Sequence, residues 1–215
     1  MYIAIEGVIG VGKTTLARLI HEAFEADLLL EVFEENPFLG SFYADRQRYA
    51  FQTQIFFLMS RYTHQHQVIP STLAAGRNIV SDYTFDKDAL FAGINLSGDE
   101  LDIYHKVHHA LADKIPQPDL LVFLRANTDT LMHRIAHRDR PYERSMERDY
   151  IQSLNEAYDT YFLHEKHPSP TLVIDTNTRD FVRHEEDLIW IETRIRQALQ
   201  LAPFQPELPN TNEPS

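Results

Sequence analysis

The sequence predicts an α/β fold in which a five-stranded parallel sheet is flanked by helices. Short, continuously apolar runs recur along the 215 residues and alternate with segments of helical periodicity, which is typical of a parallel sheet buried on both faces. A glycine-rich loop directly follows the first of these runs. Because the chain shows no internal repeat and has the length of one domain, we expect a single domain over residues 1–202.

The predicted strands are too short and too apolar to be surface helices, and charged or turn-forming residues bound them. They occupy residues 2–6 (YIAIE), 28–33 (LLLEVF), 78–82 (NIVSD), 119–124 (DLLVFL) and 171–174 (TLVI).

The predicted helices lie between these strands. The first covers residues 14–24, directly after the glycine loop. Asn36-Pro37 favours a helix start, with asparagine as cap and proline at the first helical position. Two helical stretches follow up to Leu73, and arginine-rich helices separate the last two strands. The segment 203–215 holds four prolines among thirteen residues, a composition that predicts a disordered tail.

Composition excludes several classes of function. The formal net charge of −12 argues against a nucleic-acid polymer as partner, because its phosphates require a basic face. The chain has no cysteine, which excludes thiolate metal sites, thiol nucleophiles and disulfides. No apolar run reaches membrane-spanning length, and a strand that begins at Tyr2 leaves no room for a signal peptide. We therefore expect a cytoplasmic protein without a membrane partner.

The glycine loop fits the phosphate-binding pattern Gly7-x4-Gly12-Lys13-Thr14. Glycines let successive backbone N–H groups turn toward an anion, and the N-terminus of the following helix adds a positive dipole. The lysine reaches the β- and γ-phosphates of a nucleoside triphosphate, and the Thr14 hydroxyl can bind Mg²⁺. The expected ATP-binding residues are Gly7, Gly10, Val11, Gly12, Lys13, Thr14 and Thr15.

Acidic residues follow two of the predicted strands. Glu31 stands near the end of the second strand, with Glu34 and Glu35 close behind, and Asp82 ends the third. In open parallel sheets, ligands bind beyond these strand ends. A carboxylate there can accept the proton of a hydroxyl that attacks phosphorus, or bind Mg²⁺. The alternative for Glu31 is an ordinary surface acid.

An arginine-rich stretch, residues 133–148 (HRIAHRDRPYERSMER), interrupts an otherwise acidic chain. Guanidinium groups bind phosphoryl oxygens bidentately and keep their charge. We interpret residues 134–148 as a lid that closes on a transferring phosphoryl group. The alternative is a solvated helix whose arginines pair with Asp139, Glu143 and Glu147.

Five segments together resemble the deoxynucleoside kinase family, and in particular its bacterial deoxyadenosine and deoxyguanosine kinases. The similarity extends from residue 2 to about 196 and rests on "IEGVIGVGKTT", "LLLEVFEENPFLGSFY", "YAFQTQIFFLMSRY", "IVSDYTF" and "HRIAHRDRP". The resemblance implies transfer of the γ-phosphate of ATP, or of another triphosphate, to the 5′-hydroxyl of a deoxynucleoside in nucleotide salvage. It also implies a homodimer formed through a helix pair.

The resemblance assigns roles residue by residue. Glu31 resembles the general base, with Glu34 as the alternative register, and Asp82 resembles the acid near Mg²⁺ and the reacting oxygen. Tyr43 resembles the tyrosine near the sugar 3′-hydroxyl, and Glu143 its acidic partner from the lid. The implied lid arginines are Arg134, Arg138 and Arg140.

The same resemblance points to residues that contact the base. Gln52 resembles the base-reading glutamine, whose carboxamide can pair with a base edge, and Met59 is expected in the same substrate pocket. Asp88 falls where relatives that accept amino-bearing bases carry an aspartate. Because a carboxylate only accepts hydrogen bonds, it favours adenine, guanine or cytosine over thymine. We expect a purine, with no discriminator between guanine and adenine.

The chain departs from the family at one position. Many members follow the strand-end acid with arginine, whereas this chain has Tyr83-Thr84, and Arg61 is the candidate substitute. Two alternatives stay open at this stage. Thymidylate kinase shares the loop and the arginine lid but usually carries that arginine, and a P-loop nucleotide switch would lack a pocket for a second substrate.

Overall fold

The computed structural model describes residues 1–164 and 167–203. The segment 204–215, which holds nearly all of the predicted disordered tail, lies outside the described residues. Within the described part, the strands are β1 (Tyr2–Glu6), β2 (Ala26–Leu29), β3 (Asn78–Ser81), β4 (Leu120–Arg125) and β5 (Thr171–Asp175).

These strands form one parallel sheet in the order β2-β3-β1-β4-β5. The predicted five-stranded parallel sheet is therefore confirmed. The central strand β1 is buried at all five positions, as expected for a strand with neighbours on both edges and helices on both faces. The carboxyl ends of β1, β2 and β3 lie at the same edge of the sheet, where the glycine loop begins.

The second strand ends earlier than predicted. It covers Ala26–Leu29 rather than residues 28–33, and its last pairing joins Leu29 to Ser81 of β3. As an edge strand, β2 has only β3 as a neighbour, and β3 ends at Ser81. The apolar residues beyond Leu29 therefore have no neighbouring strand to pair with, and Val32 is 46% exposed.

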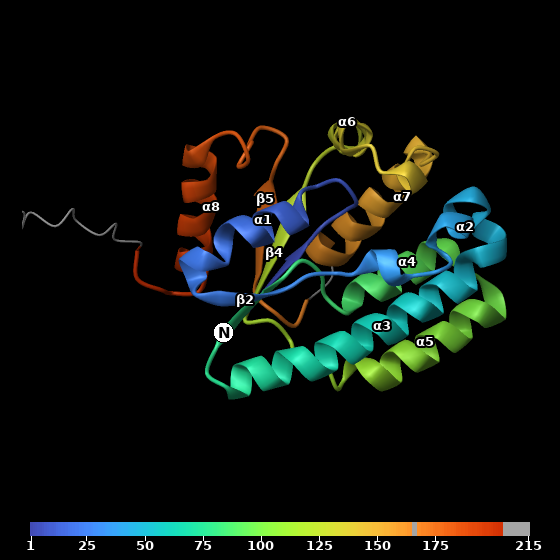
Figure 1. Cartoon of the computed structure of the whole chain (residues 1–215), viewed down its shortest axis with the longest axis horizontal. Helices are drawn as coiled ribbons and strands as arrows, with labels where there is room; N and C mark the ends of the chain where they lie inside the picture. Colours follow the sequence, from blue (N-terminus) through green and yellow to red (C-terminus); the bar gives the residue numbers. More distant parts are fainter. Residues whose placement is uncertain (165–166, 204–215) are drawn as a thin grey trace, which may run out of the picture.

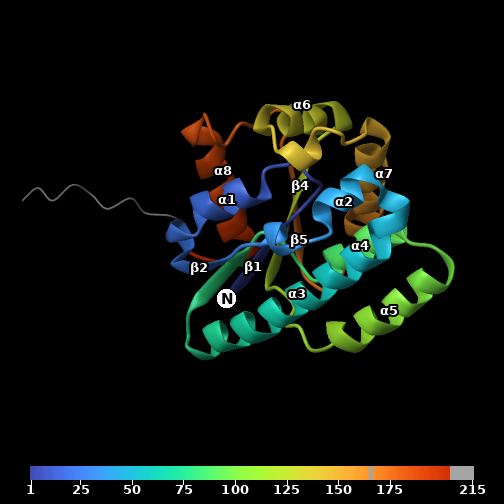
Figure 2. The same cartoon turned by 45° about the vertical axis from the view of Figure 1, so that its right-hand side comes forward.

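The helices between the strands match the predicted alternation. Figures 1 and 2 show α1 and α8 on one side of the sheet, and α3, α4, α5 and α7 on the other. Their bounds are α1 Lys13–Ile20, α2 Leu39–Ala44, α3 Arg46–Ala74, α4 Asp86–Asn95, α5 Gly98–Ala112, α6 Thr128–Arg138, α7 Arg148–Asp159 and α8 Glu185–Ala198.

Asn36 shapes the loop before α2 differently from the prediction. The helix begins at Leu39, three residues after the predicted cap. The Asn36 side chain accepts a hydrogen bond from the Phe38 backbone N–H at 2.9 Å and donates one to the Thr53 carbonyl at 3.2 Å. It thus forms a local turn and ties this loop to α3, which positions the chain that follows Glu31.

The arginine-rich stretch is not one continuous helix. Its first part lies in α6, a short 3₁₀ turn covers Pro141–Glu143, and α7 begins at Arg148. This turn brings the middle of the stretch back over the glycine loop. None of the described helices combines the length and the apolar character that crossing a bilayer requires.

Candidate active site

The glycine loop has the backbone geometry that phosphate binding requires. Gly7 and Gly10 adopt φ values of +144° and +87°, which are accessible mainly to glycine. A Cβ atom at Gly7 would lie 2.4 Å from the Leu124 carbonyl oxygen. The loop opens directly into α1 at Lys13. Strand, loop and helix therefore follow one another as the sequence predicts.

Lys13 folds back over this loop. Its ammonium donates to the carbonyl oxygens of Gly7 at 2.6 Å and Val8 at 3.2 Å. Burial first, and next the positive charge of Lys87, together lower the pKa of Lys13 to about 8 against the opposing effect of nearby carboxylates. The hydrogen bonds of this ammonium go to neutral carbonyl oxygens, and a triphosphate would give it negatively charged partners.

Thr14 and the two strand-end acids form a connected group. The Thr14 hydroxyl donates to one carboxylate oxygen of Asp82, and the other accepts the Glu31 backbone N–H at 2.8 Å. These contacts exist because β2 and β3 are neighbours and end together. A hydroxyl and a carboxylate oxygen side by side suit Mg²⁺, which takes one or two carboxylates and completes its shell with phosphate and water. In keeping with that sparse protein shell, no cluster of three or more metal-binding side chains occurs among the described residues.

Glu31 points inward and is held by two cations. One carboxylate oxygen accepts from Nε of Arg61 at 3.0 Å, and the other accepts from the ammonium of Lys87. Burial by itself would raise the pKa of Glu31, but the charges of Arg61 and Lys87 outweigh it and hold that pKa well below its usual range. Glu34, the alternative base, is exposed. The placement therefore favours Glu31.

A cavity of about 100 Å³ lies between these groups and the arginine-rich turn. It brings together residues that the sequence assigns to the triphosphate, to the sugar and to the metal. Its lining includes Gly10, Lys13, Thr14, Glu31, Tyr43, Asp82, Arg138, Arg140 and Glu143.

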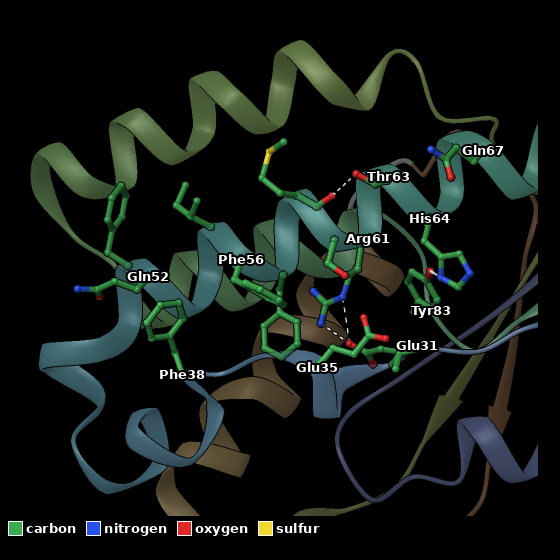
Figure 3. Close-up of a pocket in the computed structure, with 16 residues that line it drawn as sticks. Glu31, Glu35, Phe38, Gln52, Phe56, Arg61, Thr63, His64, Gln67 and Tyr83 are labelled. Atoms are coloured by element: carbon green, nitrogen blue, oxygen red, sulfur yellow. Dashed lines mark hydrogen bonds and ion pairs between the residues drawn. The ribbon is translucent and has the colours of Figure 1, made fainter.

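The two glutamines of the FQTQ motif line different spaces in the structure. Gln54, rather than Gln52, lines the cavity, and Gln54 is 2% exposed. Gln52 is exposed and lines an outer groove of about 870 Å³ along α3, together with Met59. Glu31 and Arg61 line both this groove and the cavity. Figure 3 shows Gln52 far from the Glu31–Arg61 pair. Two positions along a helix differ by about 200° of rotation, so the motif FQTQ presents its two glutamines on opposite faces.

Asp88 lies next to the cavity lining through its contact with Arg61, which lines the cavity together with Gln54. Asp88 is fully buried and pairs with the Arg61 guanidinium, which also contacts Glu31. The second carboxylate oxygen of Asp88 has no hydrogen-bond partner within the described part of the chain. A buried acceptor of this kind is costly unless a ligand supplies a donor. Asp88 therefore has an unused acceptor oxygen one residue behind the cavity lining.

The turn at Pro141–Glu143 places its acid in the same cavity. Glu143 is 5% exposed, and both of its oxygens accept from Arg138 at 2.7 Å. The Tyr43 ring stacks on Tyr142 with 6.0 Å between ring centroids. Tyr43 and Glu143 therefore line one cavity. Arg144 instead forms a solvated salt bridge at the surface, because its partner Asp139 is exposed. For this arginine the alternative to a phosphate-binding role therefore describes the structure.

Arg134 lies apart from this cavity. Its guanidinium donates to the Val11 carbonyl at 3.3 Å and to both the hydroxyl and the carbonyl oxygen of Thr176. It lines a neighbouring cavity of about 420 Å³ together with the glycine loop, Thr15 and Arg138. One helical turn separates Arg134 from Arg138, so that Arg138 lines both cavities whereas Arg134 lines this one alone.

Two further residues escaped the sequence analysis: Lys87 lines the cavity, and Glu6 supports the glycine loop. Lys87 contacts Glu31, although its neighbourhood "DKD" reads as an ordinary charged helix start. Glu6 is fully buried, and its carboxylate accepts from the backbone N–H groups of Gly7 at 3.1 Å and Thr84 at 2.6 Å. Burial raises the pKa of Glu6. An acid at the end of a buried strand, directly before the glycines, was the signal available in the sequence.

Tyr83 does not replace the arginine that many relatives carry. Its hydroxyl lies 3.3 Å from Nδ1 of His64, and it lines the outer groove (Figure 3). Arg61, the candidate substitute, does contact Glu31.

Comparisons with known proteins agree with this geometry. The chain is 35% identical over 201 residues to the deoxyguanosine kinase of Bacillus subtilis (strain 168), covering 92% of this chain and 97% of that protein. It is 34% identical to the deoxyadenosine kinase of Dictyostelium discoideum, covering 86% of this chain and 75% of that protein. A solved structure of deoxyadenosine kinase from M. mycoides with bound dATP superposes with a TM-score of 0.79 at 25% identity, covering 91% of this chain and 99% of the other.

A family model described as deoxynucleoside kinase matches residues 3–200, which is nearly the whole described chain. Together with the glycine loop, the paired strand-end acids and the arginine-rich turn, this match shows that the chain belongs to the deoxynucleoside kinase family.

Proposed function

We propose that this protein transfers the γ-phosphate of ATP, or of another nucleoside triphosphate, to the 5′-hydroxyl of a deoxynucleoside, with a purine as the preferred base, in nucleotide salvage. The observation that carries the proposal is the group formed by Glu31, Asp82 and Thr14. In this group an acid and a hydroxyl–carboxylate pair lie beside the glycine loop, which supports a general base and a metal site there. Relatives named deoxyguanosine and deoxyadenosine kinases support the purine preference.

The glycine loop and Lys13 hold the triphosphate in this proposal. Loop amides and the N-terminus of α1 meet the phosphate oxygens, and the ammonium of Lys13 leaves its carbonyl partners for them. The Thr14 hydroxyl and the Asp82 carboxylate hold Mg²⁺. When bound, the metal neutralises charge on the β- and γ-phosphates. The backbone contact from Glu31 orients the Asp82 carboxylate for this task.

Glu31 accepts the proton of the 5′-hydroxyl as that oxygen attacks phosphorus. A carboxylate with a lowered pKa is fully ionised at neutral pH and can take this proton within hydrogen-bond reach. Arg138 and Arg140 stabilise the negative charge on the transferring group, and Arg134 contacts the triphosphate from the neighbouring cavity. Tyr43 and Glu143 bind the sugar 3′-hydroxyl. Residues 134–148 act as the lid of a single domain over residues 1–202.

Gln54 and Asp88 read the base. The Gln54 carboxamide offers a donor and an acceptor side by side, and Asp88 offers acceptors alone. Adenine, guanine and cytosine present amino groups to such a site, whereas thymine would leave the buried carboxylate unpaired. Gln52 and Met59, which the resemblance suggested, line the outer groove and not the cavity that Gln54 lines.

Steady-state assays with ATP and a panel of deoxyguanosine, deoxyadenosine, deoxycytidine and thymidine test the proposal. We expect the highest kcat/KM for a purine and the lowest for thymidine. Thymidine monophosphate in the same assay separates this activity from thymidylate kinase. ATP hydrolysis at the same rate with and without any nucleoside would instead favour a nucleotide switch and overturn the proposal.

We further propose a cytoplasmic homodimer. Exposed apolar side chains on two helices of the same layer, Met59 on α3 and Ile103 on α5, supply apolar surface for such contact. Light scattering on the purified protein would then give twice the 25.0 kDa mass of one chain, and a mass of one chain would contradict the dimer.

A further inference from the structure

Lys87 is a buried lysine inside the cavity to which the function above gives no task. It occupies the second position of α4 and is 6% exposed. Its ammonium binds the Glu31 carboxylate and lies 5.8 Å from the centre of the Phe91 ring. Lysine is almost never this buried unless it is paired. The pairing with Glu31 therefore accounts for the burial of Lys87, and packing around it fixes the position of the side chain.

Lys87 shares its cavity with the groups that the proposed function assigns to both substrates. Its ammonium pairs with Glu31, the acid that faces the hydroxyl. Gly10 and Lys13 of the glycine loop line the same cavity, together with Arg138. A γ-phosphoryl group between the glycine loop and Glu31 would therefore bring its oxygens into the cavity that holds the Lys87 ammonium.

Substrate binding changes the surroundings of the contact between Lys87 and Glu31. The cavity holds about 100 Å³, whereas pockets for drug-sized ligands measure roughly 300–1,000 Å³. Glu31 and Arg61 line both this cavity and the outer groove of about 870 Å³, and Lys87 reaches Glu31 from the cavity side. A hydroxyl that hydrogen-bonds to the Glu31 oxygen held by Lys87 competes with this ammonium for it.

We propose that Lys87 is a catalytic residue that moves from Glu31 to the γ-phosphoryl oxygens when both substrates bind, an inference that rests on the proposed kinase function. Its compact ammonium can exchange a carboxylate for a phosphoryl oxygen by rotation of its flexible stem. The 5′-oxygen then forms a bond to the γ-phosphorus, and the bond from that phosphorus to the β,γ-bridging oxygen breaks. The hydroxyl proton passes to the freed Glu31 oxygen, ADP leaves with the electron pair, and Lys87 stays protonated throughout.

The two substitutions K87M and K87R test this role in the full chain. Methionine keeps the stem without the charge, and arginine keeps the charge. K106M is the matched control, because Lys106 is exposed on α5. With Mg·ATP and the preferred deoxynucleoside, we expect K87M to lower kcat by about 10²–10³-fold while the nucleoside KM changes by less than about threefold. K87R should recover roughly tenfold of that loss, and K106M should match the wild type.

A purely structural lysine would give a different pattern, in which K87M lowers Tm and raises KM with kcat unchanged. That pattern, or a kcat for K87M equal to that of the wild type, would overturn the proposal. If K87M does not fold, K87Q serves instead, since its amide can still donate a hydrogen bond to Glu31. A wild-type kcat in K87Q would overturn the proposal, and a loss of kcat comparable to that expected for K87M would support it.

The same assays distinguish failure of this inference from failure of the proposed function. If the wild type is active and K87M is equally active, only the proposed role of Lys87 is contradicted. If the wild type shows no nucleoside-dependent ADP release, the proposed function is contradicted, and this inference with it.

Discussion

The backbone N–H of Glu31 donates a hydrogen bond of 2.8 Å to Asp82, which also binds the Thr14 hydroxyl. The expected base and the expected metal ligand are therefore coupled through one carboxylate. The contact uses the backbone of Glu31, so it constrains where the residue sits and leaves both oxygens of its side chain for other partners. Substitutions of the Glu31 side chain can therefore remove its charge without removing this support.

We expect E31Q to lower kcat by about 10²–10⁴-fold, the usual contribution of a general base. The nucleoside affinity should change little, because glutamine has the same shape and can still bind Arg61. Steady-state kinetics and nucleoside titration measure the two effects separately. E34Q is the matched control, since Glu34 is exposed and follows Glu31 by three residues. Normal turnover in E31Q together with a loss in E34Q would transfer the base role to Glu34.

Replacing Gln54 by alanine should weaken nucleoside binding with a smaller effect on kcat at saturation. Loss of a paired, buried carboxamide leaves base-edge groups unsatisfied, which costs about 1–3 kcal/mol, or roughly 5- to 150-fold in KM. Q52A, on the opposite face of α3, should leave KM unchanged. The comparison is made by nucleoside titration of both variants. Unaltered binding in Q54A would show that the base lies elsewhere.

R138M should lower kcat by about 10²–10³-fold, because Arg138 lines the cavity where charge develops on the transferring group. It should also free the buried Glu143 from its bidentate partner. R144M is the control on the same stretch, since Arg144 pairs with Asp139 at the surface. Equal activities of the two variants in a coupled ADP-release assay would contradict the proposed lid function.

ATP binding should take up a proton near pH 8.5. The pKa of Lys13 is lowered to about 8 in the free protein by burial and by Lys87, so its neutral form prevails above that pH. Triphosphate oxygens raise this pKa again, so the bound ammonium is charged. At pH 7 the lysine is already charged and uptake should be small. Calorimetry in buffers of different ionisation enthalpy measures the protons exchanged. K13R, which is always charged, should show no such uptake, and identical uptake in K13R would assign the proton to another group.

Local features of this protein follow from neighbouring residues, and the sequence predicted them correctly. Each of the five strands, and the glycine loop, is encoded by fewer than ten consecutive residues. The backbone of Gly7–Lys13 adopts its conformation because glycine alone reaches the required φ values at low cost. The resemblance to the kinase family, which rests on such local motifs, is likewise confirmed by the family match.

The site residues depended on contacts between segments far apart in the chain. Gln52 and Gln54 are the same residue type two positions apart, so the sequence alone does not distinguish them. The orientation of α3 against the sheet buries Gln54 at the cavity. Glu31 meets Arg61 and Lys87 across 30 and 56 residues, and no local pattern encodes those pairs. The second strand ended at Leu29 because its only neighbour ends at Ser81. The periodicity of helices and strands in the sequence predicts which residues share a face. Which face turns toward the site is decided by the packing of the whole domain.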